Sequence, residues 1–157
     1  MPQPINLRVN GGTYEAELEP DLPLLYFLRN HLELNGPKYG CGVQQCGACM
    51  VLIDGEAQPS CVTTVTQVRN RHIETLESFG TPDDLHPLQQ AFVDEQAAQC
   101  GYCLNGVLVC AKGLLDTNPV PSDEEIRQAL ERVLCRCGTH LRMLRAVARA
   151  AGTPATE

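Results

Sequence analysis

Residues 36–51 read GPKYGCGVQQCGACMV, a segment that places three cysteines among four glycines. Together with Cys61 these cysteines form a first quartet, Cys41, Cys46, Cys49 and Cys61, with the spacing C-x4-C-x2-C-x11-C. Glycine lets the main chain approach a metal centre closely and adopt positive φ, so that N–H groups can point at negatively charged sulfur. The quartet indicates a thiolate metal centre. Iron–sulfur and zinc are both compatible with it, because Cys46 and Cys49 also have zinc-knuckle spacing.

Four more cysteines form a second quartet with the spacing C-x2-C-x31-C-x-C: Cys100, Cys103, Cys135 and Cys137. A [2Fe–2S] cluster needs four thiolates, two for each iron. A four-cysteine zinc site is the alternative, although a C-x-C pair is cramped for tetrahedral zinc. Two quartets in one short chain predict two clusters in series, which is the layout of an electron relay.

Composition favours a protein stabilised by bound metal. The chain has 157 residues, 43% of them hydrophobic, and no Trp. Two halves of about 75 residues would each be marginal on hydrophobic burial alone. The net charge is −7, and two oxidised clusters would bring it to about −11, so we expect no nucleic-acid partner.

The same sequence predicts a cytoplasmic protein. The N-terminus MPQPINLRVN lacks the charged and apolar regions of a signal peptide. No apolar run approaches the roughly 18 residues of a membrane span, so we expect no direct membrane insertion. An odd number of cysteines, nine in all, argues against a disulfide framework and for reduced thiols.

The first half is predicted to form a sheet with one helix. Expected strands are residues 5–10, 13–18, 49–53 and 72–75, and the expected helix is 23–31. Asn10-Gly11 and Asp54-Gly55 are hairpin turn sequences, so a further strand follows the second turn. A sheet with one helix and a glycine-rich cysteine loop resembles the β-grasp fold of plant-type ferredoxins, which use C-x4-C-x2-C…C spacing.

The second half is predicted to be helical. Expected helices are residues 87 to about 98, 103–115, one opened by a capping box at 122–125, and one capped by Thr139 that ends near Gly152. The third helix is expected to carry one apolar face: Ile126, Leu130, Val133 and Leu134. The predicted class is therefore α+β: a β-grasp ferredoxin-like domain at residues 1–76, a linker at 77–85 and a four-helix bundle with the second cluster at 86–157.

Both quartets, in this order and spacing, resemble the small iron–sulfur subunit of the molybdenum hydroxylases, the family of xanthine dehydrogenase, aldehyde oxidoreductase and carbon monoxide dehydrogenase. The resemblance covers residues 5–150. Its motifs are GPKYGCGVQQCGACMV at 36–51, QCGYC at 99–103 and LCRCG at 134–138. These motifs favour iron–sulfur clusters over zinc at both quartets.

The chain departs from the commoner family pattern in ways that point to one branch. Leu104-Asn105-Gly106 stands where the family usually has Thr-Pro-Gly, Gly138-Thr139-His140 where it usually has Thr-Gly-Tyr, and Met50 where Thr is common. Asn105-Gly106 after QCGYC-x, the string CRCGTH at 135–140 and HPLQQAFVDEQAAQCGYC at 86–103 look like the nicotinate dehydrogenase branch, which is similar to the isoquinoline oxidoreductases.

The resemblance implies an electron-transfer subunit of a heteromeric oxidoreductase, not catalytic alone. Its large partner subunit would bind molybdopterin cytosine dinucleotide and hydroxylate an N-heteroaromatic such as nicotinate. Electrons would pass through the second-quartet cluster and then the first-quartet cluster to FAD or a cytochrome c, carried by another subunit or domain. Residue by residue, the two quartets would be the cluster ligands, and Gln99 and Cys137 would lie nearest the molybdopterin.

Other interpretations remain open at this point. One is the small subunit of an aldehyde or xanthine dehydrogenase-type enzyme, and another is a free-standing ferredoxin-like carrier. Cys110 lies in the apolar segment 103–115 and is expected to be a small core residue, not a ligand.

Overall fold

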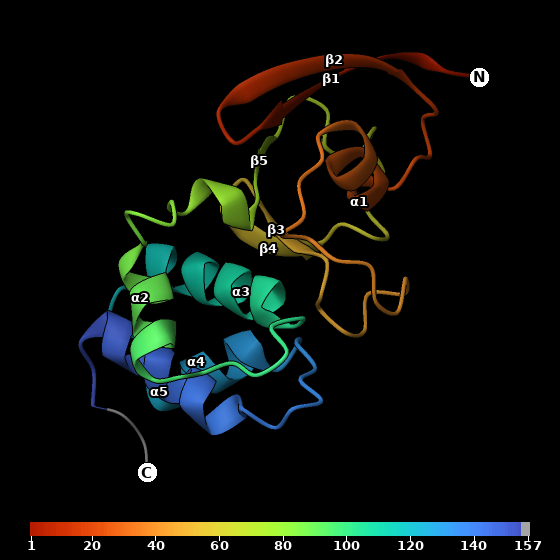
Figure 1. The fold of residues 1–157 in the computed structure, drawn as a ribbon. Helices are drawn as coiled ribbons and strands as arrows, with labels where there is room; N and C mark the ends of the chain where they lie inside the picture. Colours follow the sequence, from red (N-terminus) through yellow and green to blue (C-terminus); the bar gives the residue numbers. More distant parts are fainter. Residues whose placement is uncertain (155–157) are drawn as a thin grey trace.

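A computed structural model describes residues 1–154 and places a small sheet above a bundle of helices (Figure 1). The sheet has five strands: β1 (Gln3–Val9), β2 (Gly12–Leu18), β3 (Met50–Ile53), β4 (Glu56–Pro59) and β5 (His72–Glu74). Their order is β2-β1-β5-β3-β4, in which β1 and β5 run parallel and the other pairs antiparallel. A short helical segment packs beside the sheet, with α1 at Leu24–Tyr26 and a π-helical turn at Phe27–His31.

The two predicted hairpin turns are confirmed. Asn10 and Gly11 have φ of 51° and 80°, and Asp54 and Gly55 have φ of 52° and 85°. Two consecutive residues with positive φ match the right-handed twist of the flanking strands, which is why Asn-Gly and Asp-Gly suit this position. The Asp54 side chain also accepts a hydrogen bond from the His72 N–H at 2.8 Å, tying this hairpin to β5.

Four helices make up the second half, as predicted: α2 (Pro87–Asp94), α3 (Leu104–Thr117), α4 (Asp123–Leu130) and α5 (His140–Ala151). A 3-10 turn at Leu76–Ser78 precedes them. Residues 155–157 of the predicted second domain lie outside the described residues. The α3 helix is buried along most of its length, as its apolar sequence predicts.

Three details of the predicted helices are wrong. Helix α2 ends at Asp94, short of residue 98, because Gln96 takes φ of 50° and reverses the chain. Helix α4 ends at Leu130, so Leu134 does not share its apolar face and is 65% exposed. Thr139 precedes α5, but its hydroxyl makes no capping bond and lies 3.5 Å from the Cys135 sulfur. Residue periodicity carries no signal for these chain reversals.

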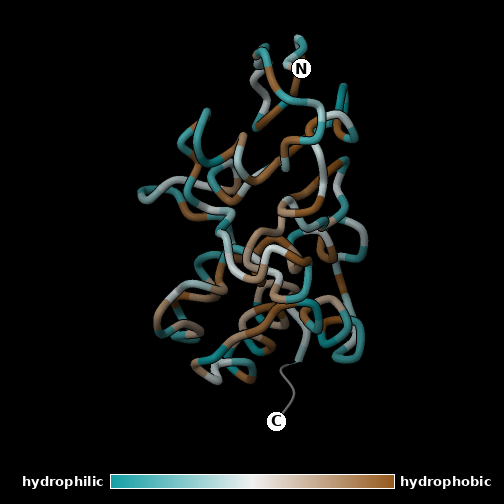
Figure 2. Tube along the Cα trace, turned by 90° about the vertical axis from the view of Figure 1, so that its right-hand side faces the viewer, coloured by the Kyte–Doolittle hydropathy of each residue, from teal (hydrophilic) through white to brown (hydrophobic). Residues whose placement is uncertain are grey.

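Two hydrophobic cores meet at β3. All four residues of this strand are buried. Val51 and Ile53 belong to the core of the sheet half, whereas Met50 and Leu52 belong to the core of the helical half. Successive side chains of a strand point to opposite faces, so one strand serves both cores. Figure 2 shows hydrophobic stretches running through the interior of both halves.

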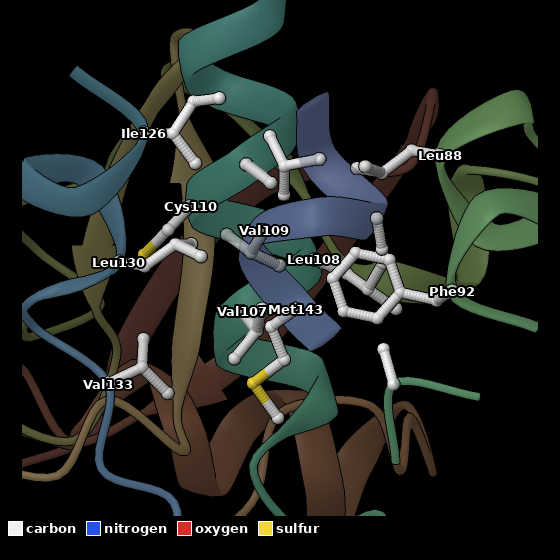
Figure 3. Packing of buried hydrophobic residues seen from close by; sticks show 14 of the residues in the cluster. Leu88, Phe92, Val107, Leu108, Val109, Cys110, Ile126, Leu130, Val133 and Met143 are labelled. Atoms are coloured by element: carbon white, nitrogen blue, oxygen red, sulfur yellow. The ribbon is translucent and has the colours of Figure 1, made fainter. Parts of the chain in front are cut away.

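Helix α3 is the centre of the helical core (Figure 3). Side chains from the neighbouring helices converge on it, among them Leu88 and Phe92 of α2, Ile126 of α4 and Met143 of α5. Cys110 points from α3 into this core and is 4% exposed, and burial raises the pKa of its thiol to about 11. The expectation that Cys110 is a core residue agrees with this position. No helix within residues 1–154 is long and apolar enough to cross a membrane.

His86 begins α2 as a titratable N-cap. Its Nδ1 accepts a hydrogen bond from the Leu88 N–H at 3.2 Å, which only the neutral ring can do. Burial, and then the charge of Lys112, lower the pKa of His86 from its ordinary 6.5. The folded state therefore binds this proton less readily than the unfolded chain, and its contribution to stability is lost as pH falls below 6.5 towards the folded-state pKa.

We expect His86→Asn to flatten the dependence of stability on pH, because asparagine caps the helix without titrating. In the native chain the urea midpoint should rise between about pH 5.5 and about pH 7.5, and the rise should be smaller in H86N. His72→Asn, in strand β5, is the matched control. Equal pH slopes for the native chain and H86N would contradict the assignment.

Candidate metal centres

The loop that carries the first quartet directs N–H groups at sulfur. The N–H groups of Val43, Gln45 and Cys46 donate to Cys41 Sγ at 3.4, 3.2 and 3.4 Å. The Cys41 N–H in turn donates to Cys46 Sγ at 3.3 Å. Such donors stabilise thiolate charge and the charge of a bound cluster. The chain achieves this by taking positive φ at Gly42, Gln44 and Gly47.

The four thiols of the first quartet lie as two pairs. Cys41 contacts Cys46, and Cys49 contacts Cys61. Cys41 is exposed, Cys49 is buried immediately before β3, and the other two are half-buried. Two pairs of thiols match the two irons of a [2Fe–2S] cluster, each of which takes two cysteine ligands.

The second quartet has the same paired arrangement although 31 residues separate its middle cysteines. Cys100 contacts Cys137, and Cys103 contacts Cys135. Cys103 directly precedes α3, and Cys135 and Cys137 lie in the loop between α4 and α5. Packing of these helices therefore brings the distant C-x2-C and C-x-C pairs together.

Each quartet combines a readily ionised thiol with a buried, protonated one. Hydrogen bonds from the Val43 N–H and then from Cys46 and Gln45 lower the pKa of Cys41 to about 7, against the effect of burial. Burial acts to raise the pKa of Cys135, but hydrogen bonds from Thr139 and Cys103 outweigh it and bring that pKa to about 7.

The deeper partners behave in the opposite way. Burial raises the pKa of Cys49 to about 12, and it also raises the pKa of Cys103 to about 12. Ligation requires thiolate, so a metal binding here must displace protons from the buried thiols.

Thiols of both quartets line one cavity of about 230 Å³: Cys41, Cys46, Cys100, Cys103 and Cys135. The Leu134 N–H donates to the Cys46 carbonyl at 3.0 Å, which connects a residue next to Cys135 directly to a member of the first quartet. The Tyr102 hydroxyl donates to the Tyr39 carbonyl across the same junction. The two quartets are therefore neighbours, with no intervening element of secondary structure.

Two glycines permit this close approach. A Cβ on Gly106, in the first turns of α3, would lie 2.2 Å from the Gly47 carbonyl oxygen. A Cβ on Gly47 would lie 2.5 Å from the Arg132 carbonyl oxygen, and Gly47 has φ of 74°. Real Cβ contacts do not come this close, so only glycine fits at either position.

Gln99 and Cys137 lie together at the surface of the helical half. Gln99 Nε2 donates to the Cys137 carbonyl at 3.5 Å, and the Gln99 side chain is exposed. The structure thus places both residues that the family resemblance assigns to the molybdopterin side on one face. Within residues 1–154, no three His, Cys, Asp or Glu side chains gather as a site for a single metal ion. Eight thiols in four pairs, with N–H donors beside them, fit two [2Fe–2S] clusters.

Comparison with known proteins agrees with this geometry. Residues 7–75 match the model of a 2Fe-2S iron-sulfur cluster binding domain, and residues 75–148 match that of a [2Fe-2S] binding domain. A nicotinate dehydrogenase subunit of Pseudomonas putida is 58% identical over 153 residues, which are 98% of each chain. The chain belongs to the small iron–sulfur subunits of the molybdenum hydroxylases. The alpha subunit of isoquinoline 1-oxidoreductase from Brevundimonas diminuta, another relative, is 47% identical over 94% of this chain and 97% of its own.

A solved structure extends the comparison to three dimensions. Aldehyde oxidoreductase from Desulfovibrio desulfuricans superposes with a TM-score of 0.92 at 40% identity, over 96% of this chain and 17% of that longer one. This confirms the predicted α+β class, with a plant-type ferredoxin domain followed by a helical [2Fe–2S] domain. The chain is thus the iron–sulfur subunit of an oxidoreductase and not its catalytic chain.

Sequence reasoning missed two residues of this small subunit that hold the quartets together. Leu134 is predicted to lie in the core and instead joins the loops through its N–H. Asn105 stands out in the sequence only as a departure from the family pattern, yet its side chain contacts the strand that follows Cys49. The sequence did offer one signal for Asn105: it is a single amide inside a helix that is apolar nearly all round. A buried polar group needs a hydrogen-bond partner, so such an amide indicates a specific contact.

Proposed function

We propose that this chain is the electron-transfer subunit of a heteromeric molybdenum hydroxylase that acts on an N-heteroaromatic compound such as nicotinate. Its large partner carries molybdopterin cytosine dinucleotide, and the terminal acceptor is FAD or a cytochrome c. When bound, [2Fe–2S] clusters supply one-electron redox chemistry, so the two electrons of a substrate oxidation can leave the molybdopterin site one at a time.

In this proposal the eight paired cysteines hold the clusters, and the rest of the chain sets their placement and potential. The observation that carries the proposal is the single cavity lined by thiols of both quartets. The Leu134 N–H to Cys46 carbonyl bond joins the two ligand loops there. N–H donors at Cys41 favour the extra negative charge of a reduced state.

Two further parts of the proposal rest on the comparisons. Identity of 58% to a nicotinate dehydrogenase subunit, and of 47% to an isoquinoline oxidoreductase subunit, supports a nitrogen heterocycle as substrate. The two domain models meet at residue 75, which supports a division of the chain near the predicted linker at 77–85. Nine cysteines without a disulfide suit a reducing compartment, and we propose the cytoplasm.

Cys137→Ser should stop electron transfer to the acceptor in the assembled complex, because this cysteine lies beside Gln99 on the proposed molybdopterin side. Tagged full-length chain is purified with its partners, nicotinate is added anaerobically, and EPR follows cluster reduction. We expect both cluster signals in the native complex and loss of acceptor reduction in C137S.

Cys110→Ser is the matched control and should retain acceptor reduction. The proposed function is wrong if C137S turns over normally with the acceptor. It is equally wrong if the native chain co-purifies with no larger molybdopterin-binding subunit, as a free-standing carrier would behave.

A further inference from the structure

Asn105 is a buried amide that bridges the two halves of the chain. Its side chain is 1% exposed in the first turn of α3, two residues after Cys103. Nδ2 donates to the Ala48 carbonyl at 3.0 Å and to the Met50 carbonyl at 2.9 Å. These two carbonyls flank Cys49, so one side chain is hydrogen-bonded to the main chain on both sides of a proposed ligand.

Both partners are acceptors, which fixes the orientation of the amide. Only Nδ2 has two protons to donate, so a flipped side chain would set its oxygen against two carbonyl oxygens. Met50 depends on this bond in particular. The Ser60 N–H donates to the Cys49 carbonyl, so Met50 and Pro59 form a non-hydrogen-bonded pair and the Met50 carbonyl points away from β4, towards the side of β5. Among the described residues β5 pairs with β3 only at Leu52 and Ile53. Asn105 donates where the sheet ladder stops.

The amide is poorly suited to stabilising the fold alone. Within residues 1–154 its Oδ1 is buried and has no hydrogen-bond partner. An unsatisfied buried acceptor has lost its hydration without gaining a bond in return, and this cost offsets much of what the two Nδ2 bonds contribute. Asparagine is also a weaker helix former than leucine or alanine, so the start of α3 does not require it.

The position of Asn105 gives it an electrostatic effect on one quartet. A carbonyl without a donor directs its negative end at its surroundings, and a donor offsets that partial charge. The Ala48 and Met50 carbonyls adjoin Cys49, so donors on them favour the added negative charge of a reduced centre. Hydrogen bonds and charge near the ligands tune cluster potentials.

We propose that Asn105 is a positioning residue that holds the Cys49 segment against the helix following Cys103 and raises the reduction potential of the first-quartet centre. This inference rests on the proposed function, in that it assumes the first quartet holds a [2Fe–2S] cluster.

The test is Asn105→Leu, which keeps the branching of the side chain at Cγ and removes both donors and the unpartnered oxygen. In a potentiometric EPR titration of the anaerobically isolated full chain, the reduced-to-oxidised ratio of the first-quartet cluster at fixed potential should fall roughly tenfold, equivalent to about 59 mV for one electron. The second-quartet cluster should shift less. The first-quartet signal is identified as the one missing in Cys49→Ser.

A second readout needs no cluster chemistry. The Lys38 and Ser60 N–H groups donate to the Ala48 and Cys49 carbonyls at 3.0 and 3.2 Å. Their hydrogen exchange should accelerate roughly tenfold in N105L, because the segment loses its anchor. Asn118→Leu, at the other end of the same helix, is the matched control and should change neither readout. Asn105→Ala, which removes both donors without adding charge, should shift the potential in the same direction.

The outcomes separate the inference from the proposed function. Unchanged midpoints and exchange in N105L would overturn the role of Asn105. A fall in stability without a shift in potential would also overturn it, since a merely structural residue behaves that way. If N105L does not fold, N105A tests the same role through the same titration. A native chain that contains no iron refutes the proposed function itself.

Discussion

Cys49→Ser is expected to lower the iron content of the anaerobically isolated chain from about four atoms to about two, because each [2Fe–2S] cluster contributes two. Cys49 is the buried member of the first quartet and lies immediately before β3. A serine oxygen there lacks the softness of thiolate and is hard to ionise in a buried site. The loss should therefore be of a whole cluster. Iron and sulfide analysis with visible absorption measures it.

Cys110→Ser is the matched control for this experiment. Both cysteines are buried and burial raises the pKa of both thiols, but Cys110 lies in the hydrophobic core of the helical half and belongs to neither quartet. C110S should keep about four irons and lose only packing energy. If C49S retained the full iron content, or if C110S lost a cluster, the ligand set proposed for the first quartet would be wrong.

Gly106→Ala is expected to destabilise the protein by about 3 kcal/mol, at the upper end of what overpacking usually causes. The new methyl group would lie 2.2 Å from the Gly47 carbonyl oxygen, which is main chain and cannot rotate away. Relief requires α3 and the loop of the first quartet to separate, and this would stretch the bond from the Leu134 N–H to the Cys46 carbonyl. Urea denaturation gives the stability change, and hydrogen exchange at Leu134 reports the junction.

The same helix offers an internal comparison. A Cβ on Gly113 would lie 3.1 Å from the Leu52 Cδ2 methyl, the movable end of a side chain, and 3.3 Å from the Gly55 carbonyl oxygen, so its neighbours need to move by only a few tenths of an ångström. Gly113→Ala gains roughly 1 kcal/mol of helix propensity, so it should be neutral or mildly stabilising. Similar losses for G106A and G113A would show that the close approach at Gly47 has no special effect.

Features with a local physical cause were predicted well. Asn10-Gly11 and Asp54-Gly55 turn where expected because their backbone preferences need no distant partner. The capping box at Ser122 and Glu125 also forms, with the Glu125 N–H donating to the Ser122 hydroxyl at 3.3 Å. The left-handed Gly152, at φ of 68°, ends α5 as predicted.

Features that depend on distant contacts were not predictable from the pattern. Asn105 reaches carbonyls more than fifty positions away in the chain. The exposure of Leu134 follows from an early end of α4, which residue periodicity does not reveal. The cysteine spacings predict both quartets, and the structure pairs their thiols, but the pairing of Cys103 with Cys135 arises only from helix packing. The role of all eight as ligands stays a prediction for the iron analysis.

The double-sided burial of β3 limits how this polypeptide can be taken apart. A ferredoxin-like half excised at the linker would expose a hydrophobic sheet face, because Met50 and Leu52 would lose the helices that cover them. Such a fragment is expected to aggregate unless both residues are replaced by polar ones. Although the chain matches two separate domain models, we therefore expect its two halves to be stable only when they are produced together.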